Sequence, residues 1–190
     1  MKTQIRILAI DDGPFSFGEE RATVVGVAMR LPGYVEGVMV TDVKIDGLDS
    51  TDRILEMLHK SRYMDQVKLI ILDGVAFGGF NVLDVNHIHE RTGIPVATVT
   101  RDRPNYDEIR KALIKHFDDW QERLNMMTAT DLEEFETEHT PIFVGRIGIE
   151  REKLAEILAA STAQGALPEA LRVAHLIATA IARGESRGRA

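Results

Sequence analysis

Aspartates stand where several predicted strands of this chain end. In open α/β sheets, ligands bind outside the carboxyl ends of the strands. Carboxylate oxygens are the ligands that suit Mg²⁺ or Mn²⁺, and two such ions can clamp both oxygens of a phosphodiester displacement. Three segments supply the candidates: Asp11 and Asp12 in "LAIDDGPF", Asp46, Asp49 and Asp52 in "KIDGLDSTD", and Asp73 in "LIILDG".

Turn formation is the alternative explanation for these acids. Asp-Gly is a common turn dipeptide, and it occurs here at 12–13, 46–47 and 73–74. Asp73 is the strongest candidate ligand, because the apolar run before it is typical of a central strand. Asp46 is the weakest, since a turn explains it equally well.

The elements that would position these acids follow from hydrophobic periodicity. Strand-like runs cover 4–10, 21–31 and 34–45, with turn residues between them, which predicts an antiparallel meander. Further strands are expected within 66–74, 94–100 and 141–148, and helices over 49–61, 81–93, 105–117, 150–163 and 168–184. Ser50 or Thr51 is expected to cap the first helix, and Gly93 to end the second. The fold class is therefore α/β, with a mixed sheet flanked by helices.

Composition limits the classes of function. The chain has 190 residues, a net charge of -7 and no cysteine, which excludes disulfides and thiolate chemistry and disfavours nonspecific coating of nucleic acid. We expect one domain over 1–190, with an acidic helical insertion at 118–139. Without a signal peptide or an apolar run of membrane-spanning length, a cytoplasmic protein with no membrane partner is expected.

The Gly-rich stretch and the histidines are weaker candidates for functional residues. The Gly-rich stretch "GVAFGGF" lets the backbone approach a ligand closely, but it lacks the spacing of a phosphate-binding loop. His87 and His89 lie two residues apart, so one helical face cannot present both. His175 is flanked by apolar residues and is expected to pack within a helix.

Several long segments resemble one known family. "RILAIDDGPF", "KIDGLDSTD", "LIILDGVAFGGFNVLD", "PVATVTRDRP" and "LPEALRVAHLIATAIARGESRGRA" look like the archaeal endonuclease dU proteins, which are related to endonuclease V. The resemblance covers about 6–104 and 148–190. It implies a ribonuclease H-like fold, in agreement with the strand order above.

The same resemblance implies a set of metal ligands. Asp11 matches the first-strand carboxylate of endonuclease V, and Asp73 matches the acid of its Asp-Gly motif after the fourth strand. Its third acid is a glutamate, for which this chain offers Asp49, which we favour, or Asp52. For a fourth ligand the chain offers Glu150 or Glu152.

Substrate contacts are implied in the same way. Arg101 stands where the family has a phosphate-side lysine, and Lys44 falls near the place of its aromatic strand-separating wedge. Gly78, Gly79 and Phe80 are expected to line a pocket for an extruded base. Asp12, with Gly13 and Pro14, is expected to turn the chain away from the strand, and it stays only a candidate for supporting the ligands.

The resulting hypothesis is a Mg²⁺- or Mn²⁺-dependent endonuclease of DNA repair that cleaves DNA containing a deaminated base, with deoxyuridine favoured. Asp11, Asp49 and Asp73 would be its catalytic acids. Two alternatives stay open: a catalytically silent nucleic-acid-binding module of the same fold, and an ATP-dependent phosphotransferase-like protein. The preferred lesion, the choice between DNA and RNA, and the oligomeric state are left undecided by the sequence.

Overall fold

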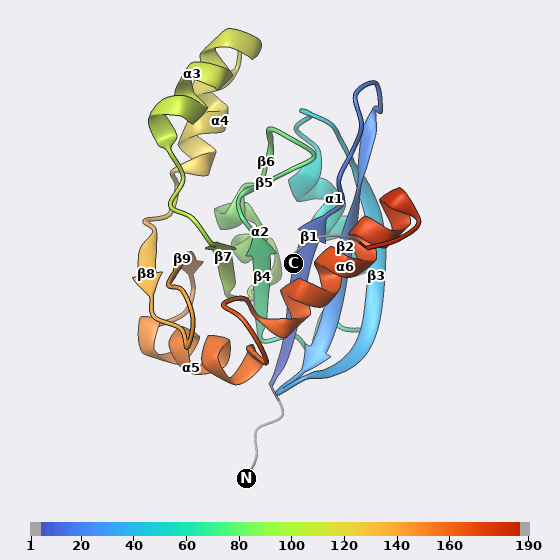
Figure 1. Cartoon of the computed structure of the whole chain (residues 1–190), viewed down its shortest axis with the longest axis vertical. Coiled ribbons are helices and arrows are strands. Elements are labelled where there is room, and N and C mark those ends of the chain that lie inside the picture. The colour runs from blue at the N-terminus through green and yellow to red at the C-terminus, as the bar shows by residue number, and fades with distance from the viewer. Residues whose placement is uncertain (1–4, 187–190) are drawn as a thin grey trace.

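The computed structural model describes residues 5–186. Strands and helices alternate along most of the chain (Figure 1). In order they are β1 (Arg6–Asp12), β2 (Arg21–Arg30), β3 (Tyr34–Lys44), α1 (Ser50–His59), β4 (Leu69–Asp73), β5 (Ala76–Phe77), β6 (Asn81–Val82), α2 (Val85–Thr92), β7 (Val96–Thr100), α3 (Tyr106–His116), α4 (Trp120–Met127), β8 (Glu133–Phe135), β9 (Ile142–Ile147), α5 (Arg151–Ser161) and α6 (Glu169–Arg183).

A mixed sheet organises the described residues. Its strand order is β3-β2-β1-β4-β7-β9-β8. Strands β1, β2 and β3 form the predicted antiparallel meander, which is thereby confirmed. Strands β4 and β7 continue parallel to β1, and β9 and β8 add an antiparallel edge. The carboxyl ends of β1, β4 and β7 therefore lie together at one edge of the molecule.

The two faces of the sheet are covered by different helices. Along β1, Leu8 and Ile10 face the core under α1 and α2, whereas Ile7 and Ala9 face α5 and α6. These side chains are fully buried, and burial of each large apolar side chain contributes about 1.5–3 kcal/mol. The alternation fixes the register, because a slip of one residue would exchange the two faces.

Helix α6 lies close against β1 and β2 on the front face in Figure 1. Two small residues of α6, Ala174 and Ala178, are buried against Val25 and Val27. The approach is tight near Gly13, where an added Cβ would stand 2.8 Å from the carbonyl oxygen of Ala178. The side chains of α6 consequently reach the end of β1.

Helix boundaries follow capping chemistry. The Asp84 side chain accepts a hydrogen bond from the His87 N–H at the start of α2, and Gly93 ends that helix in the left-handed conformation, as predicted. At α1 the prediction of Ser50 or Thr51 as N-cap is wrong by one or two residues. Asp49 occupies the cap position, and its side chain is engaged elsewhere.

Helices α3 and α4 form a hairpin that projects beyond the sheet (Figure 1). The segment 118–139, expected as an acidic insertion, contains α4 and also β8, which pairs with β9 in the main sheet. Arg123 of α4 is buried. Within residues 5–186, no helix combines the length and apolar character needed to cross a bilayer.

Candidate active site

Asp11 and Asp73 meet at the carboxyl ends of two neighbouring strands. Strand β1 pairs in parallel with β4, with Ile10 opposite Leu72. Asp11 and Asp73 each follow one residue later, so both side chains point to the face covered by α6. A side-chain hydrogen bond joins the two carboxyl groups. Parallel pairing thus brings together two acids that lie far apart in the sequence.

Burial makes this pair electrostatically unusual. Burial, followed by the negative charges of Asp73 and Asp12, raises the pKa of Asp11 to about 9. Burial also raises the pKa of Asp73, although the hydrogen bond with Asp11 and the charges of His175 and Arg101 act in the opposite direction. A buried and a half-buried carboxyl group in contact resist simultaneous ionisation unless a cation compensates their charge.

His175 of α6 completes the group around Asp11. Its Nδ1 lies 3.0 Å from Oδ2 of Asp11, while Oδ1 of Asp11 accepts a hydrogen bond of 2.8 Å from the backbone N–H of Asp12. His175 lies within a helix as expected, and the structure adds a contact with Asp11 that the sequence did not predict. The overlooked signal is the small-residue face of α6, with Ala174 and Ala178, which lets this helix approach the strand end.

Asp12 connects the strand end to the Gly-rich loop. Its Oδ2 accepts a hydrogen bond of 2.8 Å from the Gly78 N–H. Burial raises the pKa of Asp12 to about 6, although that hydrogen bond lowers it. Asp12 therefore holds the loop beside the Asp11–Asp73 pair.

The Gly-rich loop between β5 and β6 depends on glycine. Gly78 and Gly79 have φ of 54° and 84°, values that favour glycine. Asp46 supports the loop from the β3–α1 turn: its N–H donates to the Gly78 carbonyl, and its Oδ1 accepts from the Phe80 N–H, both at 2.8 Å. Phe80 packs edge-on against Phe117 of the α3–α4 hairpin.

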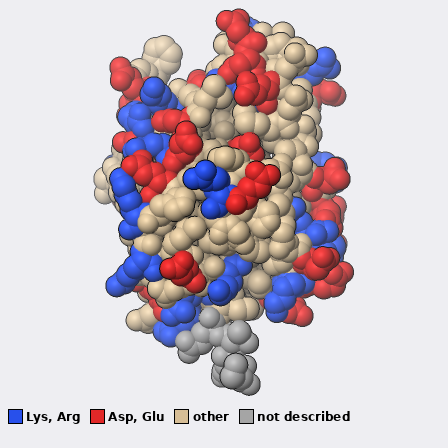
Figure 2. All heavy atoms as spheres, turned by 180° about the vertical axis from the view of Figure 1, so that it is seen from behind, with Lys and Arg blue, Asp and Glu red and all other residues tan. Residues whose placement is uncertain are grey.

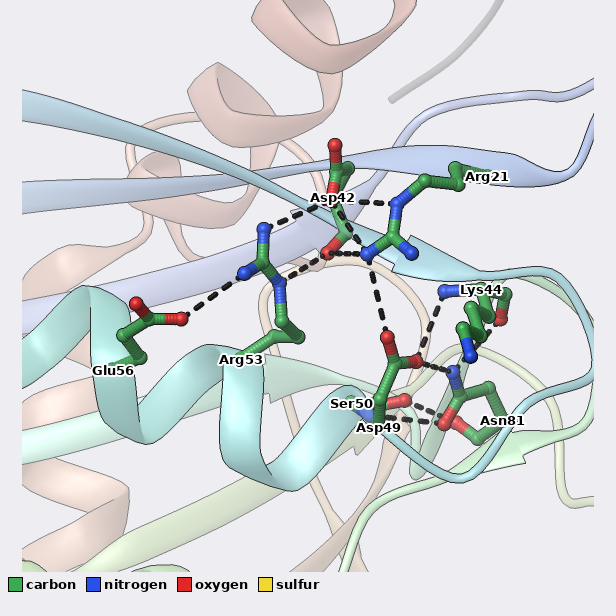
Figure 3. A network of polar contacts seen from close by, with 8 residues as sticks. All are labelled: Arg21, Asp42, Lys44, Asp49, Ser50, Arg53, Glu56 and Asn81. Atoms are coloured by element: carbon green, nitrogen blue, oxygen red, sulfur yellow. Dashed lines mark hydrogen bonds and ion pairs between the residues drawn. The ribbon is translucent and has the colours of Figure 1, made fainter.

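Asp49 belongs to a different polar network, drawn in Figure 3. Its Oδ1 accepts hydrogen bonds from the Lys44 N–H and from the amide of the buried Asn81, at 2.9 and 2.6 Å. Its Oδ2 lies 3.3 Å from the Arg21 guanidinium. Partial burial acts to raise the pKa of Asp49, but these partners hold it below its ordinary value. The structure does not bring Asp49 into contact with the Asp11–Asp73 pair.

The remaining predicted ligands also lie apart from the pair. Asp52 is exposed in the first turn of α1. Glu150 and Glu152 flank the start of α5, after Ile147, which pairs with Val96 at the beginning of β7. Asp73 pairs with Val99 near the end of β7. The two glutamates therefore stand at the opposite end of the sheet, which excludes them from this group.

A cleft of about 380 Å³ opens over the carboxylate pair. Asp12, His175, Thr179 and Arg183 line it together with the pair. The Thr179 hydroxyl is buried and has no hydrogen-bond partner among the described residues. Arg101, directly after β7, is exposed and close enough to lower the pKa of Asp73. Buried acids, an unused hydroxyl and two arginines suit a bound cation and a phosphate.

The donor set fits a hard divalent cation. Two adjacent carboxylates that resist simultaneous ionisation gain from a cation between them, and Mg²⁺ is commonly held by one or two carboxylates plus water and substrate phosphates. Among residues 5–186, no group of three or more His, Asp or Glu side chains is placed so that it could hold a metal ion. A cation on Asp11 and Asp73 would therefore complete its shell with water or phosphate oxygens.

Sequence comparison identifies the family. A family model described as endonuclease dU matches residues 3–182. The chain belongs to the endonuclease dU family. The family predicted from the motifs is thereby confirmed. A UPF0215 protein of Methanothermobacter thermautotrophicus is 42% identical over 191 residues, covering 100% of this chain and 94% of that protein.

Solved structures extend the comparison of this endonuclease dU family member. A protein of unknown function from Archaeoglobus fulgidus superposes with a TM-score of 0.84 at 33% identity, covering 95% of this chain and 100% of that one. Endonuclease V of Ciona intestinalis, in complex with a 24mer DNA containing an inosine followed by a ribo-adenosine, superposes with a TM-score of 0.58 at 16% identity, covering 92% and 84%. The fold is ribonuclease H-like, as predicted.

Proposed function

We propose that this endonuclease dU family member is a Mg²⁺- or Mn²⁺-dependent endonuclease of DNA repair that cleaves DNA containing a deaminated base, with deoxyuridine as the favoured lesion. The observation that carries the proposal is the pair of the buried Asp11 and the half-buried Asp73, with His175 on Asp11, at the strand ends of a ribonuclease H-like sheet. Family membership supports a nuclease.

Asp11 and Asp73 would hold the ion, which would supply Lewis-acid activation of water and neutralise charge at the phosphodiester. His175 orients Asp11 through its Nδ1 contact, since partners of ligating carboxylates fix their direction. Asp49, whose oxygens accept the Lys44 and Asn81 hydrogen bonds, would instead position the β3–α1 turn.

Substrate contacts would come from the cleft rim. Arg101 and Arg183 supply positive charge for backbone phosphates, and such contacts contribute affinity rather than sequence preference. The Thr179 hydroxyl can donate to a phosphate oxygen, which would satisfy a buried polar group. The loop of Gly78, Gly79 and Phe80 would line a pocket for an extruded base. The shape of that pocket would select uracil over the normal bases.

A cleavage assay tests the proposal. The purified protein is incubated with end-labelled duplexes that contain one deoxyuridine, one deoxyinosine or no lesion, with Mg²⁺, Mn²⁺ or EDTA. We expect metal-dependent strand cleavage of the deoxyuridine duplex and its loss in Asp11→Asn and Asp73→Asn. Asp65→Asn, at an exposed carboxylate after α1, is the matched control and should cleave normally.

Two results would overturn the proposal. One is the absence of cleavage with every divalent metal although the protein is folded. The other is Asp73→Asn cleaving as fast as the wild type, which would identify a contaminating nuclease. Metal-independent binding without cleavage would favour a binding module.

A further inference from the structure

Two phenylalanines are exposed at the turn that joins β1 to β2. Phe17 is fully exposed, and Phe15 keeps 39% of its surface accessible. The chain has seven phenylalanines, and the others are buried or half-buried. Because a buried phenylalanine side chain contributes about 1.5–3 kcal/mol to folding, the ring of Phe17 adds little to the stability of the fold.

This turn begins at the carboxylate pair. The Gly13 N–H donates to the Thr23 carbonyl at 2.8 Å, which continues the β1–β2 ladder past Asp12. Pro14 and Phe15 then line the same cleft as Asp11 and Asp73. The turn is further closed by Glu19, whose carboxylate accepts from the Ser16 N–H at 3.0 Å. Phe15 is thus held at the cleft, and Phe17 follows two residues later on the same turn.

Phe15 also reaches the Gly-rich loop. A Cβ added to Gly79 would stand 3.7 Å from the ring of Phe15. In Figure 1 the β1–β2 turn and the α3–α4 hairpin both extend past the carboxyl ends of the strands. Seen from behind, the upper end of the molecule carries two projections separated by a notch (Figure 2). Phe15 therefore stands between the cleft and the Gly-rich loop, and Phe17 lies two residues further along the same turn.

The charges of the turn indicate which part of a nucleic acid it would meet. No lysine or arginine stands within 13–20, whereas Glu19 and Glu20 do. Such a segment repels phosphates, so its contact would be with the face of a base rather than with the backbone. Phosphate contacts are available from Arg183, which lines the cleft at its rim.

A second copy of the chain fits this surface less well. A stable interface buries about 800 Å² on each partner, whereas one aromatic side chain buries about 150–250 Å². Two rings on an acidic turn are too small for such a contact. They match a single nucleobase, whose stacking on an aromatic side chain contributes about 1–3 kcal/mol.

We propose that Phe15 and Phe17 form a stacking platform for an unpaired nucleobase of the DNA strand that enters the Asp11–Asp73 cleft. The proposal rests on the proposed function and adds to it a specific contact. Phe15, which lies against the Gly-rich loop, supplies the fixed ring, and Phe17 supplies the outer one. A base held there keeps the strand unpaired next to the scissile phosphodiester.

Binding measurements without cleavage test the platform. A fluorescein-labelled 12-nucleotide single strand with one deoxyuridine is titrated in EDTA, and anisotropy gives Kd. Phe17→Ala should weaken binding about 5- to 150-fold, the range that corresponds to the loss of one stacked base. Phe17→Trp should bind at least as well as the wild type, and Phe17→Leu should resemble Phe17→Ala. Tyr34→Ala, at an exposed aromatic residue at the far end of the sheet, should have no effect.

DNA strands that lack one base identify the nucleobase that stacks on Phe17. A set of 12-nucleotide strands, each with an abasic spacer at one position, is measured with the wild type and with Phe17→Ala. At one position the spacer should weaken wild-type binding but leave Phe17→Ala unchanged. Equal losses for both proteins at every position, or a wild-type Kd for Phe17→Ala, would overturn the platform.

Cleavage and light-scattering measurements distinguish failure of the platform from failure of the proposed function. If the wild type cleaves deoxyuridine DNA and Phe17→Ala binds and cleaves equally well, the platform is wrong and the proposed function stands. If the wild type neither binds nor cleaves this DNA, both the proposed function and the platform are overturned. A wild-type dimer in light scattering that becomes a monomer in Phe17→Ala would assign the rings to self-association and overturn the platform.

Discussion

His175 and Asp11 lie 164 positions apart in the sequence, and their side chains meet at 3.0 Å between Nδ1 and Oδ2. This contact joins α6 to the end of β1, directly beside Asp73. Because Asp11 also accepts the Asp12 N–H, its carboxyl group is held in one orientation. The following predictions start from this arrangement.

His175→Ala should weaken the metal response of cleavage. Loss of a residue that orients a ligating carboxylate typically lowers metal affinity or activity on the order of 10- to 100-fold. The measurement is the initial cleavage rate against Mg²⁺ concentration. His87→Ala, at a half-buried histidine on α2, is the control and should behave as wild type. A wild-type Mg²⁺ response in His175→Ala would remove His175 from the site.

Metal-free stability should fall with rising pH because of Asp11. Its pKa is about 9 in the folded protein against an ordinary value of 3.8, so the folded state binds more protons than the unfolded state between these values. The stability supplied by the protonated form is complete below about pH 4 and is lost as pH rises toward 9. Asp11→Asn has no carboxyl group to ionise and so does not lose this stability. Its free energy of unfolding in EDTA at pH 8 should exceed that of the wild type by at least about 1 kcal/mol.

Urea unfolding in EDTA at pH 5 and pH 8 measures that difference. The advantage of Asp11→Asn should be larger at pH 8 than at pH 5, and saturating Mg²⁺ should reduce it by stabilising the wild type. An advantage that is the same at both pH values would show that the carboxyl group of Asp11 titrates normally.

Arg123→Met should loosen the α3–α4 hairpin. The Arg123 guanidinium donates to the carbonyls of Gly47 and Phe80 at 2.9 and 2.6 Å and pairs with Asp119. Removal of the guanidinium leaves these buried carbonyl oxygens without a hydrogen-bond donor. The loss in the free energy of unfolding should be about 1–3 kcal/mol. Urea unfolding measures the loss, and Lys111→Met on the exposed side of α3 is the matched control. Equal stability of the two variants would contradict a structural role for Arg123.

Asp49→Asn should separate a positioning role from metal binding. Its ion pair with Arg21 is partly exposed, so we expect a loss of only about 0.2–1 kcal/mol in stability. The Mg²⁺ concentration for half-maximal cleavage should stay close to that of the wild type, whereas Asp73→Asn should be inactive. A large rise in that concentration for Asp49→Asn would return Asp49 to the ligand set.

The sequence by itself determined the longer elements and placed the acids at strand ends, but it missed the short strands β5, β6 and β8. Periodicity predicted the β1–β2–β3 meander, glycine predicted the end of α2, and the apolar runs before Asp11 and Asp73 put both acids at strand ends. These are local properties, because alternation, capping and turn chemistry act within a few residues.

Only the tertiary structure decided which side chains meet. The pairing of β1 with β4 brought Asp11 to Asp73, and the close approach of α6 brought His175 to both. Donors from β2, β3 and β6 drew Asp49 into a separate network, and the antiparallel direction of β9 carried Glu150 to the opposite end of the sheet. Strand direction, register and the depth of helix packing depend on contacts between distant segments, and the spacing of residues along the chain does not specify them.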